Sequence, residues 1–69
     1  MQIISRTVKD DFEAVTIANI IAKSGGDVFS VVCSEHGWSV WATIHSDNIN
    51  LIDRTFGEWL DTLGGVYVS

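Results

Sequence analysis

Two glycine pairs divide this chain into two halves of similar design. Each pair, Gly25-Gly26 and Gly64-Gly65, follows a stretch with helical periodicity and precedes a stretch rich in β-branched residues. Glycine readily adopts the left-handed backbone that ends many helices, so the pairs are typical helix terminators. The sequence therefore predicts two strand-and-helix halves that pack into one small domain.

The length of the chain leaves room for one domain only. A chain of 69 residues buries roughly 60% of the surface that its unfolded form exposes, which leaves a thin core. The apolar fraction of 46% is typical of globular proteins, and no proline or low-complexity stretch marks a linker. We expect a single compact α+β domain spanning residues 1–69.

The periodicity of apolar residues predicts six elements. Asp10 and Glu13 form the spacing of a capping box before a helix with a smooth apolar stripe, and Ser46 or Asp47 can cap a second helix. The predicted elements are a strand at 2–8, a helix at 10–23, strands at 28–34 and 38–45, a helix at 46–63 and a strand at 66–68. This order resembles the ferredoxin-like β-α-β-β-α-β fold, with a four-stranded antiparallel sheet and two helices on one face.

The two middle strands form the clearest hairpin, with a predicted two-residue loop at His36-Gly37. The predicted pairs are Glu35 with Trp38, Ser34 with Ser39, Cys33 with Val40, Val31 with Ala42, Ser30 with Thr43 and Phe29 with Ile44. This register separates apolar from polar side chains. It assigns to the core face Phe29, Val31, Cys33, Val40, Ala42 and Ile44. It assigns to the other face Val28, Ser30, Val32, Ser34, Ser39, Trp41, Thr43 and His45.

No constellation in the sequence indicates catalysis, a metal or a cofactor. His36 and His45 are separated by nine residues along a strand, which is on the order of 30 Å, and Cys33 is predicted on the opposite face from His45. The acidic residues fall at caps, turns and outer helix faces instead of forming a carboxylate pair. The glycine pairs follow helices and so lie at carbonyl ends, which do not bind phosphate. We expect neither an enzyme nor a metal or cofactor site.

Trp41 is the most informative residue, since it falls in the middle of the sheet. In one interpretation it is a core tryptophan, either because the sheet has a different register or because a second chain covers that face. The other makes it an exposed aromatic residue beside Val32 and Val28, in an apolar patch of the kind that marks a contact surface. Tyr67 on the last predicted strand could extend this patch, and the open sheet face could also pair two copies of the chain.

The acidic face of the second helix is a further candidate surface. Arg54, Glu58 and Asp61 recur at helical spacing, either as a solvated face or as an acidic patch that meets a basic partner. The predicted partner-binding residues are Trp41, Val32, Val28, His45, Asp53, Glu58 and Asp61.

The charge balance narrows the kind of partner. Nine acidic residues against four basic ones give a net charge of −5, which repels nucleic-acid backbones and anionic membranes. We therefore expect a protein partner with a basic or apolar surface. One cysteine and a start without a signal peptide favour a cytoplasmic protein.

The small size, acidity and lack of catalytic motifs resemble the small phage-encoded inhibitors of host defence complexes, including the anti-CRISPR proteins. The resemblance implies a stoichiometric inhibitor of a host protein or nucleoprotein complex. It also implies that the protein acts in the host cytoplasm. It supplies no functional residue, because these proteins share no motif.

The predicted element order, with the stretch from Asp10-Asp11-Phe12 to Gly26-Asp27-Val28, also resembles an ACT domain. That resemblance implies a regulatory module that binds an amino acid near the loop after the first strand. The loop at Lys9-Asp10-Asp11-Phe12 lacks the Pro-Gly-like turn usual there.

Overall fold

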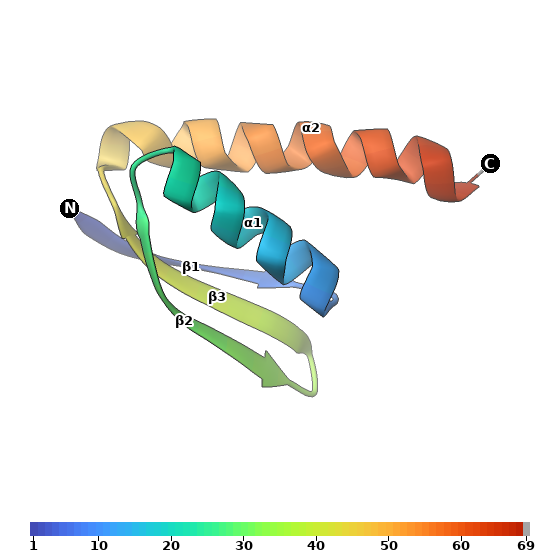
Figure 1. Cartoon of the computed structure of the whole chain (residues 1–69), viewed down its shortest axis with the longest axis horizontal. Coiled ribbons are helices and arrows are strands. Elements are labelled where there is room, and N and C mark those ends of the chain that lie inside the picture. The colour runs from blue at the N-terminus through green and yellow to red at the C-terminus, as the bar shows by residue number, and fades with distance from the viewer. Residues whose placement is uncertain (69) are drawn as a thin grey trace.

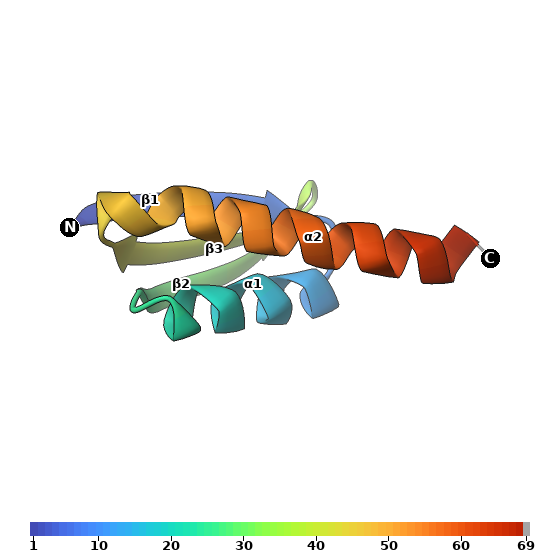
Figure 2. The same ribbon diagram turned by 90° about the horizontal axis from the view of Figure 1, so that it is seen from above.

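The chain folds into an antiparallel sheet with two helices laid across one of its faces. The computed structural model describes the backbone of residues 1–68 and the side chains of residues 1–62. The elements in chain order are β1 (Gln2–Val8), α1 (Asp11–Lys23), β2 (Asp27–Ser34), β3 (Gly37–Ile44), the short 3-10 turn η1 (Ser46–Asn48) and α2 (Ile49–Val68). Figure 1 shows the helices above the sheet, and Figure 2 shows them side by side on that face.

The sheet has three strands in the order β1-β3-β2, with β3 in the centre. The α+β class, the antiparallel pairing and the two helices are confirmed. The fourth strand predicted at 66–68 is wrong, because α2 continues through Gly64-Gly65 to Val68 and the element order is β-α-β-β-α. Each glycine costs a helix only about 1 kcal/mol, and helix extension is cooperative, so a glycine pair does not by itself end one. The end of α2 extends past the sheet and α1 in both views (Figures 1 and 2).

The start of α1 is the capping box that the sequence predicts. The Asp10 carboxylate accepts a hydrogen bond from the backbone N–H of Glu13 at 2.8 Å, and the Glu13 carboxylate accepts one from the backbone N–H of Lys9 at 3.1 Å. The Glu13 side chain is buried, so these bonds and the nearby Lys9 ammonium at 3.7 Å compensate for its lost hydration. The first helix therefore begins where the sequence places it.

The core lies between the helices and one face of the sheet. It is formed by nine buried apolar residues: Ile4, Val8, Ala14, Ile17, Ile21, Val40, Ala42, Ile44 and Ile52. Three of the six predicted core positions on the hairpin, Val40, Ala42 and Ile44, are fully buried. Because they alternate along β3, the residues between them lie on the face that the helices leave open.

The hairpin register differs from the predicted one. Ser34 pairs with Gly37, so the loop is Glu35-His36, and β2 is irregular between Val28 and Ser30, where Phe29 has no partner on β3. The extra residue of this bulge turns Val28 toward the core, against the prediction. Three predicted core residues, Phe29, Val31 and Cys33, are exposed. Val31 and Cys33 pair with Val40 and Trp38 and so keep the predicted facing, but the helices do not bury this end of β2.

Candidate functional site

The face of the sheet opposite the helices is open, and small polar residues dominate it. The strand register places three rows of directly paired residues there. These rows are Ile3–Thr43–Asp27, Ser5–Trp41–Ser30 and Thr7–Ser39–Val32. We call these nine residues the open face. Only Asp27 among them carries a formal charge, and the three apolar side chains, Ile3, Trp41 and Val32, are all exposed.

Trp41 lies in the middle row of the open face, on the central strand. Its partners on either side are Ser5 and Ser30, whose short side chains leave the indole standing above its neighbours. The residues before and after it, Val40 and Ala42, are fully buried against the helices, whereas Trp41 keeps 41% of its surface exposed. Of the two interpretations of this residue, the structure supports the exposed one within its own chain.

The other predicted members of the sheet patch do not all join Trp41. Val32 lies one row along on β2, diagonal to the indole. Val28 does not belong to the patch, because the bulge at Phe29 turns it toward the core. His45 is exposed but lies beyond the end of β3, as the residue that precedes η1. The side chain of Tyr67 lies outside the described residues.

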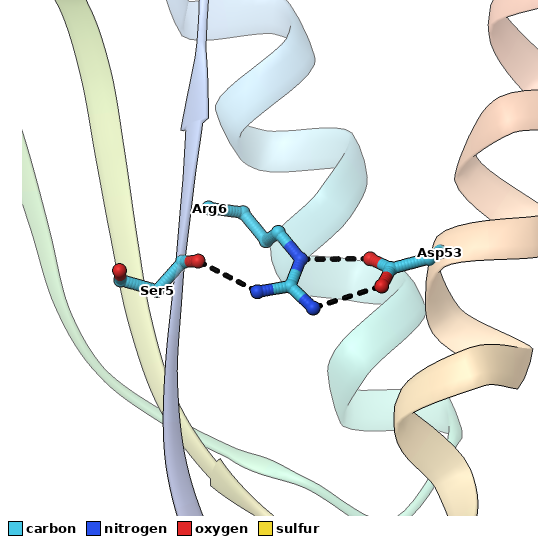
Figure 3. Close-up of polar contacts among 3 residues, drawn as sticks. All are labelled: Ser5, Arg6 and Asp53. Atoms are coloured by element: carbon cyan, nitrogen blue, oxygen red, sulfur yellow. Dashed lines mark hydrogen bonds and ion pairs between the residues drawn. The ribbon is translucent and has the colours of Figure 1, made fainter.

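Asp53 is engaged within the chain and is not a free acidic contact. Figure 3 shows the Arg6 guanidinium, which projects from β1, held by both carboxylate oxygens of Asp53 on α2. Arg6 Nε donates to Oδ1 at 2.7 Å and a terminal nitrogen donates to Oδ2 at 2.8 Å. The same guanidinium donates to the backbone carbonyl of Ser5 at 2.7 Å. The hydrogen bond with Asp53 raises the pKa of Arg6 above its ordinary value. The two charge-assisted hydrogen bonds link α2 to β1.

We expect this ion pair to contribute modestly to stability. Its side chains are 31% and 47% exposed, so water and salt weaken the attraction. A double-mutant cycle with Arg6→Ala and Asp53→Ala should give a coupling of about 0.5–1 kcal/mol in urea unfolding at low salt, and less in concentrated sodium chloride. The matched cycle with Arg54→Ala in place of Arg6→Ala should show no such coupling. Equal coupling in the two cycles would contradict a specific bridge.

Glu58 and Asp61 are exposed on α2, as predicted. They belong to the helix layer, whereas Trp41 lies on the opposite side of the sheet. The structure therefore separates the predicted residues into two surfaces, one on each side of the molecule, and a single flat partner surface cannot contact both.

Charge is distributed unevenly between these two sides. Seven acidic and two basic residues lie on α1, η1 and α2 or at the cap Asp10, so these elements carry the whole net charge of −5. The sheet and its turns carry two acidic and two basic residues, Asp27, Glu35, Arg6 and Lys9, which cancel. The open face is thus a nearly neutral surface on an acidic protein.

The titratable groups of the hairpin do not converge on a reactive centre. Cys33 is an exposed free thiol, and the predicted core position is wrong because the helices do not bury this end of β2. His36 Nε2 lies 3.4 Å from a Glu35 oxygen at the exposed turn. Among the described residues, no three His, Cys, Asp or Glu side chains are grouped so that they could hold a metal ion.

Sequence reasoning missed several exposed apolar residues. Ile3 on the open face and Phe29 at the bulge are more exposed than Trp41. In the helix layer, the Phe12 ring lies 5.6 Å from that of Trp59, which stacks on Phe56 at the same separation. Alternation along 2–8 could have placed Ile3 opposite the buried Ile4, but no sequence signal marks the bulge.

Comparison of the chain with protein-family models, curated proteins and solved structures found no match. Within the described residues, neither helix combines the length and the apolar character needed to cross a membrane.

Proposed function

We propose that this chain is a protein-binding module that contacts its partner through the open face, with Trp41 as the central anchor. The observation that carries the proposal is the exposure of a tryptophan at the centre of a sheet surface whose one charged residue is Asp27. Tryptophan is enriched among the residues that dominate binding energy, because a large rigid aromatic surface is buried at low entropic cost. Ile3 and Val32 extend the apolar area on either side of it.

The surroundings of Trp41 define the partner surface that fits. Ser5, Ser30, Ser39 and Thr43 supply hydroxyl groups around the indole, so an apolar recess rimmed by polar groups is the complementary shape. The net charge of −5 favours a partner with basic residues around that recess, since attraction at long range speeds association. A protein partner of this kind is preferred to nucleic acid or an anionic membrane, which the acidic helix layer repels.

In its specific form, the proposal is a stoichiometric inhibitor of a host protein or nucleoprotein complex that acts in the cytoplasm. The small size and acidity that resemble phage-encoded inhibitors of the anti-CRISPR type support this form. An ACT-like ligand-binding domain is not favoured, because that interpretation depended on a β-α-β-β-α-β order and the described chain lacks its last strand.

Replacement of Trp41 by alanine tests the proposed surface. Trp41→Ala should weaken binding to the natural partner about thirtyfold or more, as expected for the loss of about 2 kcal/mol at an interface anchor. Trp59→Ala is the matched control, since it removes a second tryptophan from the helix layer. The affinity is measured by titration calorimetry against a partner isolated with the wild-type chain. Circular dichroism of both variants checks that they are folded.

The helix layer is tested by the double reversal Glu58→Lys and Asp61→Lys. Asp53 is left unchanged there because its substitution would break the bridge to Arg6. We expect this double variant to slow association without removing the complex. Full affinity in Trp41→Ala, with binding lost on charge reversal, would move the interface to α2 and overturn the proposal.

A further inference from the structure

The outer edge of β2 is open. The strand order β1-β3-β2 leaves β2 paired on one side only, and Figure 1 shows no other segment of the described chain beside it. The residues of its second half, Val31, Val32, Cys33 and Ser34, are all exposed, although side chains alternate between the two faces of a sheet. An extended segment can therefore approach this half of the edge from the side without displacing a helix.

This edge lacks the features that protect most sheet edges. Lysine, proline and inward-pointing charges normally block the free N–H and C=O groups of an outer strand. Residues 28–34 contain no charged residue and no proline. The bulge lies at Phe29, so the ladder from Ser30 to Ser34 is regular. The opposite edge strand, β1, instead carries Arg6, whose guanidinium bonds to the backbone carbonyl of Ser5.

The charges around β2 select the kind of strand that can bind there. Asp27 begins the strand and Glu35 follows its end, and no lysine or arginine occurs between Lys23 and Arg54. A second β2 aligned antiparallel about Val31 would bring Asp27 of each copy opposite Glu35 of the other, and like charges in direct opposition are destabilising. An apolar segment with basic residues at both ends would instead place a basic residue opposite each of Asp27 and Glu35.

We propose that β2 binds an extended partner segment by strand addition, and that this segment is β-branched and apolar in its centre and carries lysine or arginine at its ends. The added strand extends the sheet from three strands to four, through main-chain hydrogen bonds along Val31–Ser34. Its alternate side chains contact Val32 on the open face, beside Trp41. This inference rests on the proposed function and deepens it by naming the partner's chemistry.

The probe is a synthetic nine-residue peptide of alternating valine and threonine with two lysines at each end. We expect it to bind the full chain, to shift NMR signals from residues 30–35 and to slow amide exchange within Val31–Ser34. A peptide with the same side chains but N-methylated at alternate residues cannot complete the ladder, and it should bind at least about tenfold more weakly. A glutamate-flanked peptide should also lose about tenfold.

The protein variant Asp27→Lys/Glu35→Lys should reverse the preference, binding the glutamate-flanked peptide more tightly than the lysine-flanked one. The inference is overturned if the N-methylated peptide binds equally well, which would indicate docking of side chains alone. It is equally overturned if the chain dimerises with its β2 amides protected and no peptide present, since a second copy would then occupy the edge.

The two proposals fail separately. If the lysine-flanked peptide does not bind but Trp41→Ala still weakens the natural complex, strand addition is rejected and the binding module stands. If the peptide protects β2 while Trp41→Ala leaves the natural complex unchanged, the anchor at Trp41 is rejected. In that case the peptide result still supports the open edge.

Discussion

Replacement of Gly37 by alanine is expected to destabilise the protein by about 3 kcal/mol or more, because two independent costs coincide at this position. Gly37 has a φ of +124°, a conformation that side chains with a Cβ rarely adopt. A Cβ added there would also overlap the backbone carbonyl oxygen of Val8, at the end of β1. Since that obstacle is backbone, it cannot rotate away, and the hairpin and β1 would have to separate.

Urea unfolding followed by circular dichroism measures this effect. Gly57→Ala is the matched control of opposite sign, since an added Cβ on α2 meets nothing within 4 Å and alanine is the better helix former. We expect Gly57→Ala to stabilise the protein by up to about 1 kcal/mol. A Gly37→Ala protein with wild-type stability would show that β1 does not approach the hairpin as described.

Replacement of Ile52 by alanine should cost about 3–4 kcal/mol, within the range for large-to-small changes in cores. Ile52 is 0% exposed and is the one fully buried side chain among the described residues of α2. Its removal leaves a cavity where α2 meets the other core residues. A domain of this length has a total stability of only about 3–10 kcal/mol, so the variant should be partly unfolded at 37 °C.

The neighbouring residue provides the control for Ile52. Leu51 is 41% exposed, so Leu51→Ala removes a side chain of equal size that buries much less apolar surface. It should change the free energy of unfolding by less than about 1 kcal/mol. Similar losses for the two variants would mean that α2 does not contact the core through the Ile52 side.

The parts of the fold that local chemistry determines could be predicted from the sequence. The capping box at Asp10 and Glu13 and the buried stripe through Ile17 and Ile21 are short-range patterns, and both occur in the structure. The alternation of Val40, Ala42 and Ile44 likewise revealed the buried side of β3. From these residues follows the placement of Trp41 on the opposite side.

Long-range contacts explain the errors in the hairpin. Glycine is a typical turn residue, and the sequence predicts a loop at His36-Gly37. The glycine is needed instead for the close approach of Val8, a contact between residues far apart in the chain. The bulge at Phe29 then turns Val28, predicted on the open side, toward the core. Neither feature leaves a signal in the local pattern of apolar residues.

The candidate site was predictable only in part for the same reason. Trp41 and Val32 could be assigned to the open side from alternation, but Val28 could not, because its facing depends on the bulge. The engagement of Asp53 by Arg6 joins residues 47 positions apart, so nothing in the sequence near Asp53 indicates it. The strand expected at 66–68 failed because a glycine pair is only a weak local obstacle to a helix.

The separation of charge between the helix layer and the sheet gives the molecule an electric dipole along its intermediate axis, where it measures 26 Å. Near a cationic body the chain should rotate so that its helices point inward. Its tryptophan side then turns to the outside, so a basic partner that takes up the open face must hold the chain against this rotation through short-range contacts at Trp41.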